Sequence, residues 1–220
     1  MLDITPPMRQ YMFFEPLRFG TEFAYAILVT CIFLYLYLKT REMYAISGHQ
    51  GIGHLKNVFL FFGIAHGTRF LYFVFRSVML TTDFHIPGRV ISFFSLILIT
   101  YFSTIAVGHL IYSNIWRKVN RKTFLLAVHI LAIISVAVFY LRYPLIFLFI
   151  IQFSLILILL LVNSGKNIKV LSSLLSFFWV LNLLIFHSRR ILGFEFKVLI
   201  QIISLIILIY FTYRVFKWVK

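Results

Sequence analysis

The sequence predicts an all-α integral membrane protein, a single bundle of seven transmembrane helices that spans residues 1–220. Hydrophobic residues make up 62% of the chain, only 12% of its residues are charged, and its mean hydropathy is +0.98. A soluble domain carries about 25% charged residues, and a water-soluble fold of this size could not hide so much apolar surface. The apolar residues form continuous runs instead of alternating with polar ones, which excludes the strands of a β-barrel.

Each apolar run approaches the ~20 residues that a membrane-spanning helix needs. The expected spans are residues 19–38, 58–80, 90–112, 124–140, 145–162, 170–186 and 198–216. Pro87 and Gly88 mark the turn before the third span. Pro144 starts the fifth near its first turn, where a missing N–H costs least. The sequence Asn163-Ser164-Gly165 ends the fifth span as a C-terminal stop.

The connections are too short for a soluble domain, so any chemistry is expected in the bundle or at its rims. The longest polar link, residues 39–57, has fewer than 20 residues and contains three glycines. These glycines lack the Lys-Ser/Thr pair of a P-loop, so a flexible cytoplasmic turn is expected there. His49 and His54 in this link have only Glu42 nearby to complete a tetrahedral metal set.

The basic residues are sorted between alternate loops. The first, third and fifth links with the C-terminus carry 12 basic residues and one acid, whereas the opposite side carries 8 basic residues and five acids. By the positive-inside rule the N-terminus lies outside and the C-terminus in the cytoplasm, in a cytoplasmic (plasma) membrane. The outer set is Arg9, Arg18, Arg76, Arg89, Arg142, Arg189, Arg190 and Lys197. Topology explains the net charge of +15, so no nucleic-acid partner is expected.

The second span carries a stripe of polar residues. His66, Arg69, Phe73 and Arg76 are spaced by three, four and three residues, which places them on one helix face. An ionisable residue within a span is costly and usually faces the bundle interior. Counted from the span edges, Glu22 matches the depth of Arg76, and an ion pair between them is expected. No acid matches the depth of Arg69.

The guanidinium of Arg69 must therefore find carbonyls, the amides of Asn182 or Gln201, water, or a bound anion. It is either a structural brace between helices or part of an outward-facing anion or carboxylate site with Arg76, Arg189 and Arg190. Arginine suits an anion site because its planar fork binds oxyanions with two hydrogen bonds. The candidate ligand-binding residues are Glu22, His66, Arg69, Arg76, Asn182, His187 and Gln201.

Cofactor candidates are fewer. His109 and His129 match in depth within about one turn and could ligate haem b. The tight hairpin between their helices argues against this, as does the absence of a glycine near His129. A hydrogen-bonded histidine in the bundle interior is the competing interpretation for each. The seventh span has no mid-span lysine, so a retinal Schiff base is not expected.

Three classes of function stay open. The first is a receptor-like or sensory bundle that binds a small, anionic ligand from outside and signals through a cytoplasmic partner. The second is a small organic-anion transporter or channel, which the polar residues within the spans and a hint of internal repetition suggest. The third is a membrane enzyme or b-type cytochrome that uses the bundle histidines, and the lack of protease motifs argues against an intramembrane protease. A subunit role in a membrane complex fits all three, and richness in Ile, Phe and Lys suggests a prokaryotic source.

Overall fold

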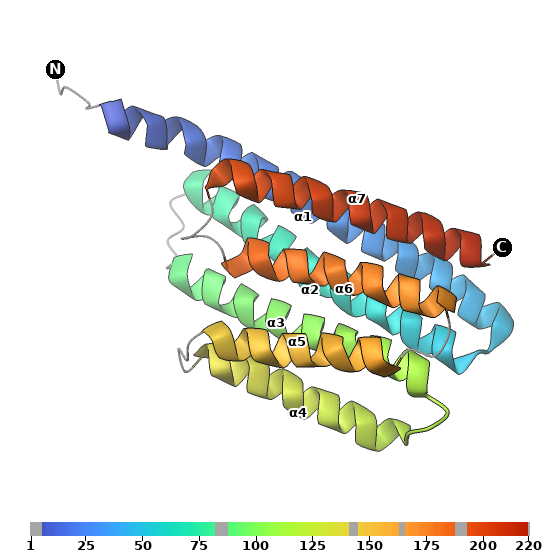
Figure 1. Cartoon of the computed structure of the whole chain (residues 1–220). Helices are drawn as coiled ribbons and strands as arrows, with labels where there is room; N and C mark the ends of the chain where they lie inside the picture. The colour runs from blue at the N-terminus through green and yellow to red at the C-terminus, as the bar shows by residue number, and fades with distance from the viewer. Residues whose placement is uncertain (1–5, 82–87, 141–144, 163–165, 188–192, 220) are drawn as a thin grey trace.

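The structure is a computed structural model that describes the chain except residues 1–5, 82–87, 141–144, 163–165, 188–192 and 220. The described residues form seven α-helices and show the all-α class (Figure 1). They are α1 (Pro6–Ser47), α2 (Gln50–Thr81), α3 (Gly88–Ile115), α4 (Arg121–Tyr140), α5 (Leu145–Val162), α6 (Lys166–His187) and α7 (Phe194–Val219). Some side chains at helix ends, including that of His187, lie outside the described set.

Five helices are long and apolar enough to cross a membrane: α1, α2, α3, α4 and α7. The described apolar parts of α5 and α6, Ile150–Val162 and Val170–Ile185, are shorter. Each expected span lies inside one helix, and the bounds of α5 coincide with residues 145–162. The other helices run past their apolar runs because the polar flanks also keep helical hydrogen bonding. The predicted turns at Pro87, Pro144 and residues 163–165 lie outside the described residues.

The flexible turn expected at residues 49–54, within the polar link 39–57, is wrong. Helix α1 continues to Ser47 and α2 starts at Gln50, so only two residues separate them. Gly48 ends α1 with φ of 62°, and its N–H donates to the Tyr44 carbonyl at 2.9 Å. This left-handed conformation at a helix C-terminus is one that glycine adopts without strain.

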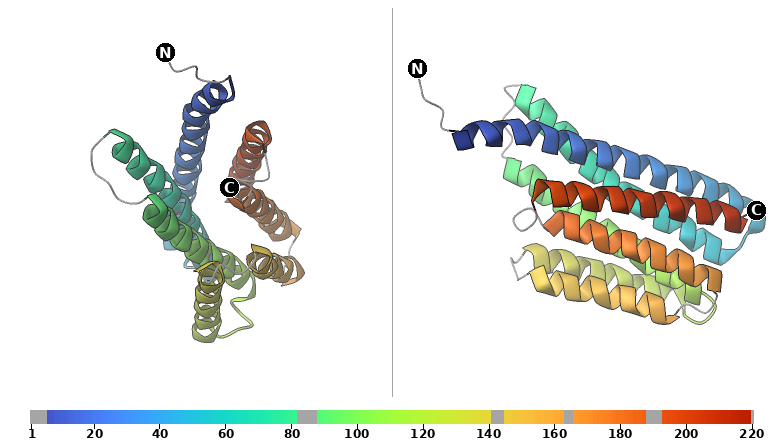
Figure 2. Two further views of the ribbon diagram at one scale, coloured as in Figure 1. Left: turned by 90° about the vertical axis from the view of Figure 1, so that its left-hand side faces the viewer. Right: turned by 45° about the horizontal axis from the view of Figure 1, so that its top comes forward.

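Successive helices run antiparallel, so α1, α3, α5 and α7 begin at the same end of the bundle (Figures 1 and 2). We call this the N-terminal end. Contacts join α1 to α2, α2 to α3, α3 to α5, α5 to α6, α6 to α7 and α7 back to α1. These six helices therefore form a closed ring, and α4 packs against α3 and α5.

The exterior of the bundle is apolar and its interior is partly polar. Leu161 is 76% exposed, Leu126 62% and Ile206 59%, although all three are large hydrophobic residues. Ionic and amide side chains are buried instead, among them Glu22 and Arg69. Water would penalise such an exterior, whereas lipid matches it. The molecule is therefore a membrane protein built around helices that can cross a bilayer.

Large aromatic side chains fill the ring below the N-terminal end. Phe33, Phe59, Phe62, Phe178 and Phe211, here called the aromatic layer, are each at most 2% exposed. The Phe33 ring centroid lies 5.3 Å from that of Phe62 and 5.5 Å from that of Phe178. Phe59 and Phe211 meet at 5.9 Å. Spacings of 4.5–7 Å are typical of packed aromatic pairs, so the side chains in this part of the bundle are closely packed.

Candidate functional site

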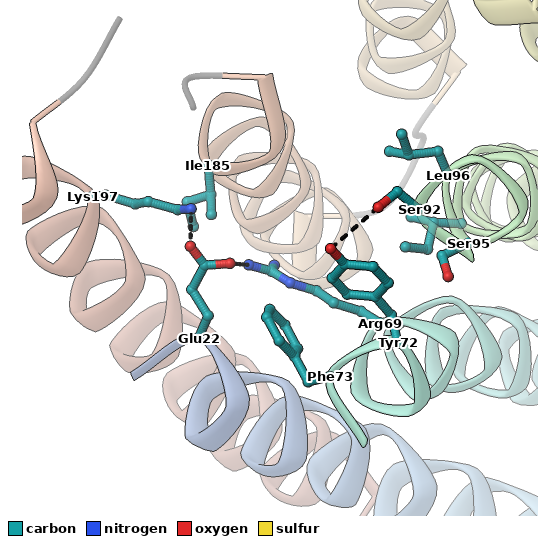
Figure 3. Close-up of a pocket in the computed structure, with 10 residues that line it drawn as sticks. Glu22, Arg69, Tyr72, Phe73, Ser92, Ser95, Leu96, Ile185 and Lys197 are labelled. Atoms are coloured by element: carbon teal, nitrogen blue, oxygen red, sulfur yellow. Dashed lines mark hydrogen bonds and ion pairs between the residues drawn. The ribbon is translucent and has the colours of Figure 1, made fainter. Parts of the chain in front are cut away.

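A buried cluster of charged residues joins three helices at the N-terminal end. Glu22 of α1, Arg69 of α2 and Lys197 of α7 are 5%, 6% and 3% exposed. The Lys197 Nζ donates to Glu22 Oε1, and Arg69 Nη2 lies 3.8 Å from Glu22 Oε2 (Figure 3). Arg18, one turn before Glu22, places Nε 3.5 Å from Glu22 Oε1 from a more exposed position. The single carboxylate of Glu22 thus serves several cations.

A set of hydrogen bonds between α1, α6 and α7 lies next to the cluster. The Tyr25 hydroxyl donates to Asn182 Oδ1 at 2.9 Å and lies 2.9 Å from Ser204 Oγ. Asn182 Nδ2 in turn donates to Ser204 Oγ at 3.1 Å. The Arg69 guanidinium carbon lies 5.3 Å from the centre of the Tyr25 ring, within the range of a cation–π contact. These contacts fix Arg69 between α1, α6 and α7.

A cavity of about 90 Å³ opens beside the cluster. It is lined by Glu22, Arg69, Tyr72, Phe73, Ser92, Ser95, Leu96, Ile99, Ile185 and Lys197 (Figure 3). At 10–15 Å³ for each water, this volume corresponds to roughly six to nine waters. A cavity of this size can hold a small polar molecule. Ser92 donates to the Tyr72 hydroxyl at 3.2 Å, which places both hydroxyls in the wall facing Arg69.

A second cavity of about 30 Å³ lies against the first and shares Arg69 and Ile99 with it. Its other lining residues are Ala65, His66, Thr100, Ser103, Gln152, Trp179, Asn182 and Leu183. Gln152 Nε2 donates to Thr104 Oγ1 at 2.9 Å, and Trp179 Nε1 donates to Gln152 Oε1 at 3.3 Å. Arg69 therefore lines both cavities.

The electrostatics favour an anion. The described lining of the first cavity contains two formal positive charges, on Arg69 and Lys197, and one negative charge, on Glu22. Charges interact strongly in a site largely withdrawn from water, and arginine forms paired hydrogen bonds with a carboxylate. The hydroxyls of Ser92, Ser95 and Tyr72 can add hydrogen bonds to an oxyanion. Such a lining is chemically able to bind a small carboxylate.

Two sequence-based expectations about the cluster are wrong. Arg76 is exposed, and Glu22 contacts Arg69 and Lys197 in its place. Arg69 was expected to match no acid in depth, yet Glu22 reaches it. The depth estimate failed because α1 begins at Pro6, well before its apolar run, so its residues are displaced along the bundle axis.

Lys197 was expected in an outer loop, and the structure corrects this as well. It occupies the first turn of α7 and is buried against Glu22. The only signal in the sequence was its position one residue before the seventh apolar run. Of the other candidates, His66 and Asn182 line the second cavity with Arg69. Gln201 is 4% exposed and lies one turn from Lys197, outside both cavity linings.

The remaining candidates are either outside the described residues or engaged elsewhere in the bundle. Arg189, Arg190 and the side chain of His187 lie outside the described residues. His109 Nδ1 lies 3.1 Å from His54 Nδ1, and its ring stacks on Phe61. This pair was missed because α2 begins eight residues before its expected span, which places His54 in the helix.

The haem candidates are each engaged by a neighbouring side chain. His129 Nδ1 lies 3.0 Å from the Tyr101 hydroxyl, whereas His109 pairs with His54. Gly108 of α3 packs closely against Val128, the residue before His129: a Cβ added to Gly108 would be 2.3 Å from Val128 Cγ1. Among the described residues, no group of three or more His, Cys, Asp or Glu could hold a metal ion.

Comparison with known proteins gives one informative relative. Neither a protein-family model nor a solved structure matches the chain. A protein of Archaeoglobus fulgidus, described as "Uncharacterized protein", is 30% identical over 216 residues, covering 92% of this chain and 94% of the archaeal one. Because the similarity extends over nearly the whole of both chains, the helical bundle belongs to the same protein family as this archaeal protein.

Proposed function

We propose that the chain is a receptor-like membrane sensor that binds a small organic anion in the cavity at the N-terminal end of the bundle. The observation that carries this proposal is the pair of cations, Arg69 and Lys197, in the wall of a cavity whose described lining has one carboxylate. The described lining therefore carries a net positive charge. Such a charge attracts an anion strongly in a site largely withdrawn from water, so the site favours a carboxylate over a neutral or cationic molecule.

The aromatic layer favours sensing over transport. The rings of Phe33, Phe59 and Phe62 have 0% exposure and lie between the cavities and the opposite end of the ring. A channel or open transport path needs polar groups or water along its length, which these rings do not provide. The cavities thus support binding from one end without passage, and the signal passes to a partner protein at the other end.

Ligand binding has a direct route to the opposite end. Glu22 and Lys197 link α1 to α7, and an anion on Lys197 competes with that contact. A change in the α1–α7 contact moves two helices that both run the full length of the bundle. Tyr35 of α1 and Phe216 of α7 meet near its far end, with ring centroids 5.4 Å apart. The cytoplasmic partner or complex subunit is expected to contact this end.

The binding test uses acetate and propionate with purified protein in detergent, measured by calorimetry. Arg69→Gln and Lys197→Met should each weaken binding roughly ten- to hundredfold, because each removes a hydrogen bond to a charged group. Arg76→Gln is the matched control: the same substitution on the same helix at an exposed position, expected to leave affinity unchanged. Equal losses at Arg69 and Arg76, or no binding by the wild-type chain, would contradict the proposal.

A flux experiment separates the sensor from the transporter. Proteoliposomes are loaded with radiolabelled methanesulfonate, a small anion that has no neutral form at ordinary pH and does not leak through lipid. If the protein is a sensor, efflux of the label should equal that from loaded vesicles without protein. Saturable efflux that Lys197→Met abolishes would support the transporter instead.

We further propose seven spans, with the N-terminal end outside and the C-terminus in the cytoplasm of a plasma membrane. The charge bias between alternate links supports this, as does the alignment of α5 and α6 beside the five long helices. The test replaces the exposed Cys31 by serine and introduces a single cysteine. In intact cells an impermeant maleimide should label Gly193→Cys, and it should label Lys118→Cys only after permeabilisation. The reverse pattern would invert the topology.

A further inference from the structure

The second cavity contains a buried histidine whose polar atoms are unused. His66 is 5% exposed, and within the described residues neither its Nδ1 nor its Nε2 has a hydrogen-bond partner. Buried polar groups without partners are rare, and each one costs free energy. The ring is held by stacking on Phe33, with centroids 5.8 Å apart and planes 19° apart, and by a contact with Phe178. Its orientation is thus fixed by packing.

His66 lies close to the proposed anion site. It precedes Arg69 by three residues on α2, which places both on one helix face about 4.5 Å apart along the axis. Both residues line the second cavity, and Arg69 also lines the first. The 30 Å³ of the second cavity correspond to roughly two or three waters. A ligand held by Arg69 can therefore extend only a short polar group toward His66.

The chemistry of the second cavity restricts that group. A neutral imidazole offers one donor and one acceptor, and a hydroxyl can pair with either. Apart from Arg69, the described lining is uncharged, so a second carboxylate would be buried without a cation of its own. Ser103 and Gln152 line the same cavity and can also bind a hydroxyl. A monocarboxylate with a hydroxyl group matches both cavities, and a dicarboxylate does not.

We propose that the ligand is a small hydroxycarboxylate, with its carboxylate against Arg69 and Lys197 and its hydroxyl hydrogen-bonded to His66. This inference rests on the proposed function and assigns its ligand class. The acid group supplies affinity through the two cations. The hydroxyl supplies specificity, because it can pair directly with the buried ring of His66.

The test compares acids that differ only in the hydroxyl: lactate with propionate, and 3-hydroxybutyrate with butyrate. In calorimetry on the full chain in detergent, at least one hydroxy acid should bind roughly two- to tenfold tighter than its partner, the value of one hydrogen bond. His66→Phe keeps a stacking ring between Phe33 and Phe178 but has no ring nitrogen, so it should abolish the preference for the hydroxy acid over its partner. His66→Gln retains a donor and an acceptor and should retain part of the preference.

Each result has one interpretation. Equal binding within both pairs of acids by the wild-type chain would overturn the role of His66 and leave the anion site standing. A preference that survives in His66→Phe would do the same, and it would point to Ser103 or Gln152 as the hydroxyl partner. If no acid of either pair binds, the proposed function itself fails. Because propionate binding reports the folded site, it also controls for misfolding of the His66 variants.

Discussion

Replacing Glu22 by glutamine tests the charge balance of the cluster most directly. The change keeps the size of the side chain and leaves Arg69 and Lys197, 6% and 3% exposed, without the carboxylate that they share. Removing one member of a buried ion pair costs about 3–5 kcal/mol because the remaining charge is uncompensated. For a chain of this size that corresponds to a fall in Tm of roughly 6–20 °C. Tryptophan fluorescence during heating in detergent measures this value.

The contrast with Lys197→Met makes the test specific. That variant leaves Glu22 beside Arg69, a balanced pair, and should cost only about 1.5–3 kcal/mol, the value of one hydrogen bond to a charged group. Adding Lys197→Met to Glu22→Gln removes one of the two uncompensated cations and should raise Tm above that of Glu22→Gln alone. Saturating propionate should stabilise Glu22→Gln more than the wild-type chain. If the losses of the two single variants simply add in the double variant, the reasoning is refuted.

Three further predictions concern packing and hydrogen bonding, each read from Tm in detergent. Tyr25→Phe should lose about 1–3 kcal/mol because buried acceptors lose their donor, and an unchanged Tm would show that water replaces the hydroxyl. Gly108→Ala places a Cβ 2.3 Å from Val128 Cγ1 and should cost about 1–3 kcal/mol. Adding Val128→Ala should recover most of that loss, and failure to do so would locate the strain elsewhere. His54→Leu and His109→Leu should each lower Tm, because each leaves one buried ring unpaired. The double variant should lose less stability than the sum of the two single losses. Additive losses would mean that the rings do not interact.

Hydrophobic runs predicted the helices well because a spanning segment must be apolar along its whole length. The stripe on α2 likewise predicted the inward orientation of Arg69, since lipid penalises a charge. Contacts between helices were harder to predict. Counting residues from span edges assumes that all helices start at one plane, which α1 and α2 violate. For that reason Glu22 was paired with the wrong arginine, and the His54–His109 contact was missed.

Side chains at helix starts were the second source of error. Lys197 precedes an apolar run by one residue, where an interfacial anchor and a buried ion-pair partner have the same sequence pattern. Only the neighbouring helix decides between them, and here α1 supplies Glu22. Arg76 shares the stripe with Arg69 but is exposed near the end of α2.

The ion pair between Glu22 and Lys197 joins positions 175 residues apart in the chain. During synthesis Glu22 and Arg69 therefore enter the membrane well before Lys197, by on the order of ten seconds at usual elongation rates. The early Glu22–Arg69 contact gives the carboxylate a partner through this interval, when a lone buried charge would hinder insertion. The second cation arrives only when α7 docks. The Glu22–Lys197 contact therefore forms only in a bundle whose last helix is in place.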